Sequence, residues 1–345
     1  MHVSVNIVTW NDRRYLPDLF ASIRSQTYTD YTVRLLDNGS ADGETVPYIM
    51  QNEPHWLAAR STKNQGSTGG YNQLMRLAMD RYTGDPTKHV MVFANSDTVW
   101  HHEMLENLVR ALEERPDVDA VQPKVFRAYS ERGDIDADSV KSDILDTTGM
   151  RVERGWRMLD RGAGEMDQGQ YDDKRDVFGP TGSVMMVRAS ALQDVAINGE
   201  MFDSDFFSYR EDADFAWRFR RAGHETLFVP TAIAHHYRGL PRNERRSWWR
   251  RFTDRRRQRP FFTALSTRNQ LFVLLKNLTL GEALRSAPRL LFFEGTRVLA
   301  GIFFEPETRR VLWRAPLLLP AMLRKRALVR RNARVPMREL RAYLE

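Results

Sequence analysis

The sequence contains no cysteine among its 345 residues. Disulfides, thiolate zinc sites and cysteine nucleophiles are therefore excluded as sources of stability or chemistry. The lack of cysteine also fits a reducing compartment. The first residues, Met1 to Val8, have neither the basic start nor the long apolar middle of a secretory signal peptide, so we expect a cytoplasmic protein.

Long apolar runs are missing as well. No stretch reaches the roughly 18 uninterrupted apolar residues that a membrane-spanning helix needs, because arginines and glutamates interrupt the apolar parts of the C-terminal third. Hydrophobic residues make up 42% of the chain and charged residues 28%. This composition indicates one large α/β core with a smaller appendage.

Charge is divided unevenly along the chain. Residues 241–345 contain 25 Lys and Arg against 8 Asp and Glu, a net charge of +17, whereas residues 1–240 contain 27 against 37, a net charge of −10. We therefore expect an acidic body over residues 1–240 and a basic helical region over residues 241–345. Apolar clusters such as Leu290 to Phe293 lie among the arginines, a mixture typical of helices on an anionic membrane surface. A solvated helical subdomain and a contact in a homo-oligomer are the alternatives.

The first 125 residues alternate between strand and helix patterns. Strand patterns cover residues 3–9, 32–36 and 89–94, and helical periodicity covers residues 15–25 and the segment that carries Met104 to Leu112. This β-α-β alternation predicts a parallel sheet flanked by helices.

Polar residues follow the strand patterns where each pattern ends. Thr9, Asp37 and the residues Asn95 to Asp97 all occupy such positions. Because ligands bind at the carboxyl ends of strands in an open parallel sheet, the three positions predict one crevice. The glycine-rich segment 64–70, which we expect to be a loop before a helix over residues 71–81, either brings backbone amides to a phosphate or forms a plain turn.

Two acidic motifs and a histidine are candidates for chemistry. Asp97 ends an apolar run, and Glu211, Asp212 and Asp214 fall in the first turn of a predicted helix. Together with His236, they could supply a metal ligand and a general base. Each has a structural alternative. Asp97 could belong to a plain turn at the end of a strand, and the three acids could only stabilise the helix dipole. His236 could be a buried core histidine.

Residues 129–176 are polar, which favours loops with short strands over a second core. Trp156 within this segment is positioned either to stack on a ligand or to pack in the interior. Gly182 lies in a loop before the strand predicted over residues 184–187.

The order of these motifs resembles that of the inverting family 2 glycosyltransferases of GT-A fold, and most closely their bacterial rhamnosyltransferase-like branch. The resemblance covers residues 3–240 and continues weakly through Arg268-Asn269 and Lys276-Asn277. The motifs that carry it are Val8-Thr9-Trp10-Asn11, Gln26-Thr27, Leu36 to Gly43, Asn64-Gln65-Gly66, Gly69-Gly70, Asn95-Ser96-Asp97, Gly182, Phe206-Phe207, Glu211-Asp212, Arg218, Gly223, Pro230 and His236.

The resemblance implies a donor site for a nucleoside diphosphate sugar. The residues that it places there are Thr9, Asn11, Asp37, Asn38, Asn64, Gly66, Gly70, Asn95 and Ser96. Asp97 and His236 would hold a divalent metal, Mn2+ or Mg2+. Asn95 departs from the family's DxD motif, so that only one carboxylate remains there and metal affinity without nucleotide should be low.

The resemblance also implies roles on the acceptor side. Asp212 would be the general base, with Glu211 beside it to raise its proton affinity by like-charge proximity. Gly182, Trp156 and Asp214 would border the acceptor. We therefore expect an inverting, metal-dependent transfer of a rhamnose-like or other hexose from a dTDP- or UDP-sugar to a glycan or lipid-linked acceptor in envelope polysaccharide synthesis, at the inner face of the cell membrane.

Two other classes of function fit parts of the sequence. A nucleotidyltransferase would share the sheet, but residues Thr9 to Asp12 are not the glycine-rich, basic loop that it needs after the first strand. A nucleic-acid-binding protein could use the arginine-rich segment from Arg242 to Arg259, but the acidic body disfavours nucleic acid as a partner. The identity of the sugar, the nucleotide and the acceptor is left open.

Overall fold

The computed structural model describes residues 1–130, 139–237 and 260–345. The strand and helix patterns predicted near the N-terminus are confirmed to within two residues at most boundaries. They correspond to β1 (His2–Thr9), α1 (Leu16–Arg24), β2 (Tyr31–Asp37), β4 (His89–Asn95) and α4 (Met104–Glu114).

The glycine-rich segment differs from its prediction. Helix α3 (Gly66–Arg81) begins at Gly66 and not after the glycines. A Cβ on Gly66, whose φ is +74°, would lie 1.9 Å from the carbonyl oxygen of Phe207, and a Cβ on Gly70 would lie 2.8 Å from a methyl of Val8. These glycines therefore let the first turns of α3 approach strand β1 and the segment around Phe207.

The central sheet has ten strands in the described part of the chain, with the order β10-β12-β6-β11-β4-β1-β2-β3 and with β5 and β7 paired to β12 and β6. Strands β1, β2, β3 and β4 are mutually parallel, and β11 runs antiparallel to its neighbours β4 and β6. The remaining strands are β3 (Leu57–Arg60), β5 (Thr98–Trp100), β6 (Ala120–Ser130), β7 (Ser139–Thr147), β10 (Asp176–Val177), β11 (Val184–Arg188) and β12 (Thr226–Tyr237). Strands β8 (Met150–Glu153) and β9 (Arg157–Asp160) form a separate hairpin.

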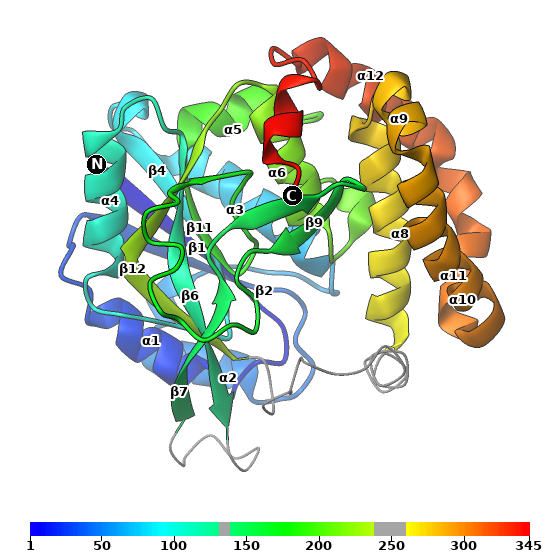
Figure 1. Cartoon of the computed structure of the whole chain (residues 1–345). Coiled ribbons are helices and arrows are strands. Elements are labelled where there is room, and N and C mark those ends of the chain that lie inside the picture. Colours follow the sequence, from blue (N-terminus) through cyan, green and yellow to red (C-terminus); the bar gives the residue numbers. More distant parts are fainter. Residues whose placement is uncertain (131–138, 238–259) are drawn as a thin grey trace.

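Helices cover both faces of this sheet. Along β4, Val90 and Val92 belong to the apolar cluster that contains α1 and α4, whereas Met91 and Phe93 belong to the cluster that contains α3, α5 (Ala189–Val195) and α6 (Glu211–Arg221). Alternation of side chains along a strand produces this division. Figure 1 shows α1 and α4 on one side of the sheet.

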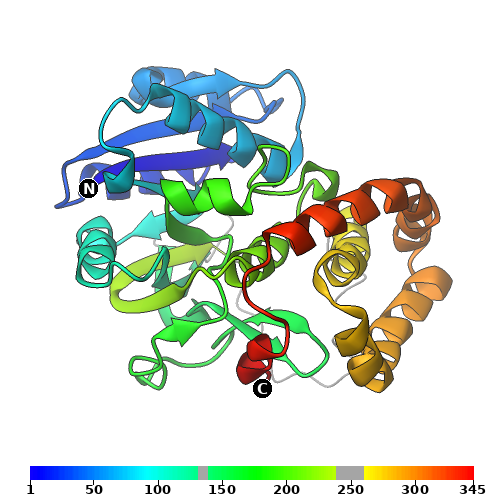
Figure 2. The same ribbon diagram turned by 90° about the horizontal axis from the view of Figure 1, so that it is seen from above.

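The C-terminal region forms a helical layer beside the sheet, as Figures 1 and 2 show. Its elements are α8 (Pro260–Asn277), α9 (Leu280–Leu290), the π-helical turn η4 (Leu291–Gly295), α10 (Thr296–Phe304), α11 (Pro306–Arg314), η5 (Ala315–Leu318), α12 (Leu319–Asn332) and η6 (Glu339–Tyr343). In the view of Figure 2, α12 runs from the outer helices back toward the sheet.

A third apolar cluster joins this layer to the body. Trp156, beside the β8–β9 hairpin, stacks on Trp217 of α6 with ring centroids 5.3 Å apart, and Phe272 of α8 and Met337 lie in the same cluster. Residues 129–176 form loops with short strands such as β8, β9 and β10, as expected, but some of their side chains join this shared cluster. Four apolar side chains of this segment, Met150, Val152, Trp156 and Met158, are buried in a cluster with helices that follow much later in the sequence.

The boundary predicted at residue 240 and the arginine-rich segment from Arg242 to Arg259 lie outside the described residues. Among the helices that the structure does describe, none has both the length and the apolar content to cross a bilayer.

Candidate active site

Strand register brings the predicted crevice residues together. Thr9 at the end of β1 is paired with Asp37 at the end of β2, and Val8 is paired with Asn95 at the end of β4. Three strands therefore end side by side, as the sequence pattern predicts for a ligand site in a parallel sheet.

Asp97 and His236 meet at this edge. Strand β5 runs antiparallel to β12 with Thr98 opposite His236. Oδ1 of Asp97 lies 3.1 Å from Nε2 of His236. The His236 side chain is 7% exposed and that of Asp97 is 27% exposed, so solvent and ligands reach the pair from the Asp97 side.

A second carboxylate holds the other side of the imidazole. Oδ2 of Asp146, on β7, lies 2.8 Å from Nδ1 of His236, and Arg127 lies 3.5 Å from the other Asp146 oxygen. A carboxylate at Nδ1 favours the tautomer that carries its proton there, which leaves the Nε2 lone pair facing Asp97. The sequence did not predict Asp146, because the polar segment that contains it has no motif.

These side chains fit a divalent cation. One carboxylate oxygen and one imidazole nitrogen face each other, and the imidazole is oriented by a buried carboxylate, as is usual for metal-binding histidines. Two protein ligands alone make a weak site for Mn2+ or Mg2+, which would need further oxygen ligands from elsewhere.

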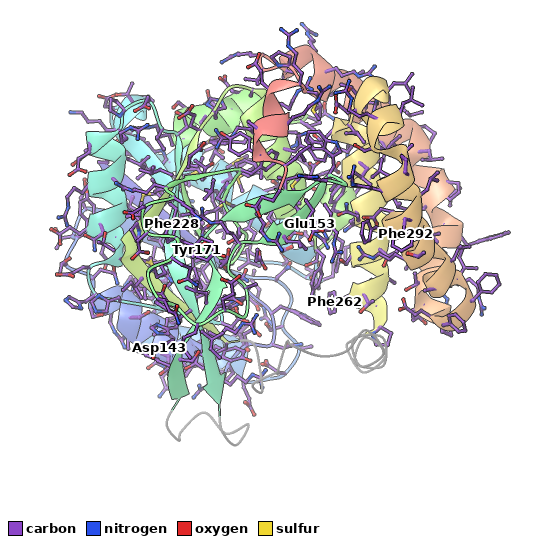
Figure 3. All side chains as sticks on the ribbon, in the orientation of Figure 1. Asp143, Glu153, Tyr171, Phe228, Phe262 and Phe292 are labelled. Carbon is purple, nitrogen blue, oxygen red and sulfur yellow. The ribbon has the colours of Figure 1, made fainter. Side chains whose placement is uncertain are left out.

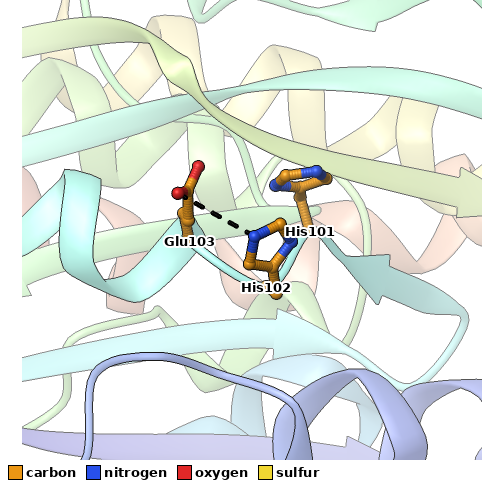
Figure 4. Close-up of side chains that lie close together, drawn as sticks. All are labelled: His101, His102 and Glu103. Atoms are coloured by element: carbon orange, nitrogen blue, oxygen red, sulfur yellow. Dashed lines mark ion pairs between the residues drawn. The ribbon is translucent and has the colours of Figure 1, made fainter.

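In the described parts of the chain, one group of three side chains has closely spaced metal-binding atoms. It consists of His101, His102 and Glu103, which Figure 4 shows at the entry to α4. All three side chains are exposed and follow one another in sequence, and Asp97 lies at the opposite end of β5. This group is therefore separate from the crevice.

The residues around Asp97 form a compact turn. Ser96 donates a hydrogen bond of 2.6 Å to Asp12, and Tyr71 of α3 donates one of 3.0 Å to the amide oxygen of Asn95. Burial raises the pKa of Asp12, and the nearby charge of Asp97 raises it further, while the bond from Ser96 opposes the shift. The sequence prediction missed Asp12 and Tyr71, although Asp12 directly follows the Thr9-Trp10-Asn11 motif.

Glu211 and Asp212 open helix α6, as predicted. Ser67, in the first turn of α3, donates a 2.5 Å hydrogen bond to Oε1 of Glu211, and Oε2 of Glu211 is buried with no hydrogen-bond partner among the described residues. Burial raises the pKa of Glu211 to about 7, and the charge of Asp212 adds to the effect. A carboxyl with this pKa loses its proton near neutral pH.

Asp212 is joined to the Asn95 to Asp97 turn by two residues. Its Oδ2 accepts a 3.1 Å hydrogen bond from the backbone N–H of Gly182, and the neighbouring Ser183 accepts a 3.0 Å hydrogen bond from the N–H of Asn95. The candidate base and the candidate metal turn therefore border the same short segment before β11.

The segment that precedes Glu211 is strained. Phe207, Tyr209 and Arg210 have φ values of 66°, 71° and 68°. For residues other than glycine, each such conformation costs about 1–3 kcal/mol of free energy. It persists where surrounding contacts enforce it. Strain of this kind is concentrated at functional sites.

Asp37 and Asn11, which were predicted to bind the sugar donor, already form hydrogen bonds within the chain. Asp37 is fully buried, and its two oxygens accept hydrogen bonds from Arg60, at 3.1 Å, and from the N–H of Ser40. Asn11, with a φ of 56°, accepts a hydrogen bond from the N–H of Ala41. The hydroxyl oxygen of Thr9 is buried without a hydrogen-bond partner in the described part of the chain. A nucleotide base at Asp37 would have to replace the half-exposed Arg60.

Asn38 has a structural position rather than a ligand-facing one. It is 2% exposed, donates to Asn64 and to the carbonyl of Gly66, and accepts from the N–H of Gln65. Asn64 in turn accepts from the N–H of Gly66. Asn38 thus fixes the entry to α3, which corrects its assignment to the donor itself.

Two predicted acceptor-side residues also need correction. Trp156 is fully buried in its stack with Trp217, so its ring offers no face to a sugar. Asp214 is fully buried as well and is paired with Arg218 and Lys276, both at 2.9 Å. Gly182, which contacts Asp212, is the member of this group that borders the candidate base.

Comparisons with known proteins identify the family of this chain. Residues 2–259 match the family model described as glycosyltransferase like family 2. An N-acetylglucosaminyl-diphospho-decaprenol L-rhamnosyltransferase of Mycobacterium tuberculosis is 27% identical over 237 residues, which cover 66% of this chain and 74% of that protein. An uncharacterized glycosyltransferase of Nostoc sp. is 27% identical over 115 residues, 33% of each chain.

Solved structures show the same fold. GalNAc-T7, crystallised with UDP, GalNAc and Mn2+, matches 80% of this chain with a TM-score of 0.55 and 12% identity. TarS of S. aureus matches the whole chain with a TM-score of 0.52 and 15% identity. The chain spans about half the length of these two proteins, 48% and 50%. The family match and the solved structures together show that the chain has the GT-A fold with a C-terminal helical region and belongs to family 2 of the glycosyltransferases.

Proposed function

We propose that this enzyme transfers a rhamnose-like or other hexose, with inversion, from a dTDP- or UDP-sugar to a hydroxyl of a glycan or lipid-linked acceptor. The observation that carries the proposal is that Asp212 and the Asn95 to Asp97 turn border one segment, Gly182-Ser183. This proximity supports a base on one side of a donor sugar and a diphosphate site on the other.

Asp212 has the chemistry of the general base. Each of its oxygens accepts one backbone hydrogen bond, from Gly182 or from Ala213, so lone pairs remain for a proton. It would take the proton of the acceptor hydroxyl as the new C–O bond forms at the anomeric carbon. The bond from that carbon to the diphosphate breaks, and its electron pair leaves with the diphosphate. Attack from the face opposite the leaving group inverts the configuration.

Donor binding is assigned to the crevice edge. Thr9, Asn11 and Asp37 would contact the nucleoside, and Asn95 and Ser96 would contact its ribose or phosphates. Gly66, Gly70 and the bordering Asn64, at the amino end of α3, would border the nucleotide, although the N–H groups of Gly66 and Thr68 already donate to Asn64 and to the carbonyl of Phe207.

Asp97 and His236 would hold the divalent cation, with Asp146 fixing the imidazole. A bound Mn2+ or Mg2+ would stabilise the negative charge that develops on the leaving diphosphate. Because the chain supplies only one carboxylate there, we expect nucleotide and metal to bind together. Micromolar affinity for Mn2+ without nucleotide would contradict this assignment, and Asp97→Ala or His236→Ala should weaken the joint binding.

The helical layer is assigned to an anionic membrane surface. Its exposed apolar side chains include Phe303 at 71%, Trp313 at 85% and Leu317 at 81% exposure. Phe292, labelled in Figure 3, lies in the same layer and is 63% exposed. Residues 260–345 carry 16 Lys and Arg against 6 Asp and Glu, a net charge of +10, and their arginines alternate with these apolar residues.

The basic side chains of this layer suit contact with anionic lipid headgroups, and its exposed apolar side chains suit contact with acyl chains. The named substrate of the mycobacterial relative is decaprenol-linked. A lipid-linked acceptor and a position at the inner face of the cell membrane, in envelope polysaccharide synthesis, fit both observations.

Thermal unfolding with nucleotides tests the donor assignment. Purified protein is heated with UDP, GDP or dTDP, each with Mn2+, with Mg2+ or with a chelator. We expect UDP or dTDP with metal to raise the Tm, since a ligand at 100 times its Kd adds about 2.7 kcal/mol to stability. Equal Tm values under all conditions, or equal shifts by ATP, would contradict a nucleoside diphosphate sugar as the donor.

A further inference from the structure

Helix α8 reaches into the strained segment that precedes the candidate base. Asn269 is fully buried, and its amide nitrogen lies within hydrogen-bond distance of the carbonyl oxygens of Phe206, Ser208 and Tyr209, at 2.9, 3.0 and 2.8 Å. Two amide hydrogens thus serve three carbonyls of a segment whose backbone is left-handed at three positions.

A neighbouring arginine strengthens this contact. Arg268 donates through Nε and Nη2 to the amide oxygen of Asn269, at 2.9 and 2.7 Å. The same guanidinium donates to the carbonyl of Asp205 at 2.8 Å. The orientation of Asn269 is therefore fixed, with its nitrogen toward the strained segment.

The other side of this segment rests on the amino end of α3. The hydroxyl of Thr68 donates a 3.1 Å hydrogen bond to the carbonyl oxygen of Phe207, and the hydroxyl of Ser67 lies within hydrogen-bond distance of the same oxygen. Ser67 also donates a hydrogen bond to Glu211. Residues 206–210 are thus held between α3 and α8, and their left-handed backbone follows from contacts on both sides.

A second attachment from α8 lies one turn into α6. Lys276 is fully buried, with Nζ 2.9 Å from Asp214 and 2.6 Å from Asp203, and Asn277 donates a 2.9 Å hydrogen bond to the other oxygen of Asp214. Burial raises the pKa of Asp214, but Lys276 and Arg218 outweigh burial and lower the pKa to about 2. Asp214 is therefore a charged anchor between the helices.

We infer that α8 positions the base: Asn269 holds the backbone that leads into Glu211 and Asp212, and Lys276 with Asn277 holds the helix that carries them. These are positioning residues, because they act through residues 206–214 and none touches Asp212. The C-terminal helical region is then part of the catalytic machinery as well as a surface layer. This inference deepens the proposed function and rests on it.

Two isosteric substitutions test the inference. Asn269→Leu removes the amide that contacts the three carbonyls. Gln270→Met is the matched control, since Gln270 is also buried, at 1% exposure, and its amide nitrogen has no hydrogen-bond partner in the described structure. Turnover is measured as nucleoside diphosphate release from the dTDP- or UDP-sugar that the parent uses best, and binding as the Kd for that nucleoside diphosphate with Mn2+.

We expect Asn269→Leu to lower kcat by about 10–100-fold, the effect of a misplacement near 1 Å, with nucleotide Kd changed less than about twofold. Gln270→Met should change neither quantity by more than about twofold, because it breaks no contact to the segment. Asn269→Asp, which keeps the shape but replaces the donor with an acceptor, should behave as Asn269→Leu.

Hydrogen exchange distinguishes a failure of this inference about α8 from a failure of the proposed function. Amides of residues 206–214 should exchange faster in Asn269→Leu than in the parent or in Gln270→Met, whatever the reaction. If the parent releases no nucleoside diphosphate from any donor, the proposed function fails. The exchange rates still show whether Asn269 holds the backbone of residues 206–214. Unchanged exchange in Asn269→Leu, or a kcat equal to that of Gln270→Met, would overturn the inference.

Discussion

Oδ2 of Asp146 lies 2.8 Å from Nδ1 of His236, so a buried carboxylate on β7 orients the imidazole that faces Asp97 on the opposite side. The two residues belong to strands that both pair with β6, β7 in antiparallel and β12 in parallel orientation. The candidate metal site is thus built across three neighbouring strands rather than within one motif.

Asp146→Asn should weaken metal binding without abolishing nucleotide binding. Loss of such an outer carboxylate commonly costs 10–100-fold in metal affinity, so we expect a change of about that size in the apparent Kd for Mn2+ at saturating nucleotide. Asp143→Asn is the matched control, because Asp143 is exposed on the same strand (Figure 3). Equal Mn2+ affinity of the two variants would remove Asp146 from the site.

Asp212→Asn should separate chemistry from binding. Without a general base, turnover should fall by about 10²–10⁴, while the Kd for the nucleoside diphosphate with metal stays close to that of the parent. Asp80→Asn, at an exposed position of α3, serves as the control and should retain full turnover. If Asp212→Asn keeps half of the parent rate, the base is elsewhere, and Glu211 is the next candidate.

Stability should fall as pH rises because of Glu211. The pKa of this carboxyl is raised from 4.5 to about 7 in the folded chain, chiefly by burial, so between these values the folded state binds more protons than the unfolded state. Its contribution is fully present below about pH 4.5 and is lost as pH rises through 7. The shift corresponds to roughly 3 kcal/mol as an upper figure.

Denaturant unfolding of the parent and of Glu211→Gln at pH 5 and pH 8 measures this effect. The variant carries no charge at either pH, so it should gain stability over the parent by about 1–3 kcal/mol between the two pH values. A difference between parent and variant that does not change with pH would show that Glu211 titrates normally.

Gly66→Ala should destabilise the fold far more than Gly43→Ala. Both glycines have positive φ, +74° and +73°, but a Cβ on Gly43 meets nothing within 4 Å, whereas a Cβ on Gly66 would collide with the backbone of Phe207. The strained φ should cost each variant about 1–2 kcal/mol. The collision should cost Gly66→Ala about 1–3 kcal/mol more, measured as the difference in unfolding free energy. Equal losses would mean that α3 moves away freely.

Membrane binding should depend on the exposed apolar residues of the helical layer. A Phe303→Ser, Trp313→Ser, Leu317→Ser triple variant should lose most of its flotation with anionic liposomes, because it lacks the side chains that enter the acyl region. The control is Met50→Ser with Met166→Ser, which removes exposed apolar residues of the body. Flotation of the parent should also weaken as salt rises, since each basic residue near the surface contributes about 1 kcal/mol.

Equal flotation of the triple variant and the control would remove the membrane role. Failure of the full chain to float at low salt would do the same. A concentration-dependent mass that is lost in the triple variant would instead assign the surface to a contact between copies of this chain.

The parallel part of the sheet could be predicted because its strands and helices have strong apolar periodicity. Strand ends are visible as the positions where that periodicity stops, and the pattern alone therefore predicts that Thr9, Asp37 and Asp97 share one edge. Helix α6 was predictable from its acidic first turn.

The supporting contacts could not be predicted in the same way. Asp146 reaches His236 only because β6 pairs with β7 and β12, and Asn269 reaches Tyr209 only because α8 packs beside α6. Asp146 lies in a polar segment without a motif, and the resemblance that includes Arg268-Asn269 does not say which carbonyl groups the amide of Asn269 contacts. The role of Trp156 could not be predicted either. An aromatic residue in a polar segment can stack on a sugar or pack in a core, and only its contact with Trp217 shows that it packs in the core.

The third apolar cluster has a consequence for the order in which this protein is completed during synthesis. The indole of Trp217 packs against Met337, and its N–H points to the sulfur of that residue. At ribosomal rates of about 5–20 residues per second, on the order of ten seconds pass between the emergence of these two partners. In that interval the nascent sheet exposes an apolar surface on the side of α6, so this is the stage at which chaperones are expected to bind the chain.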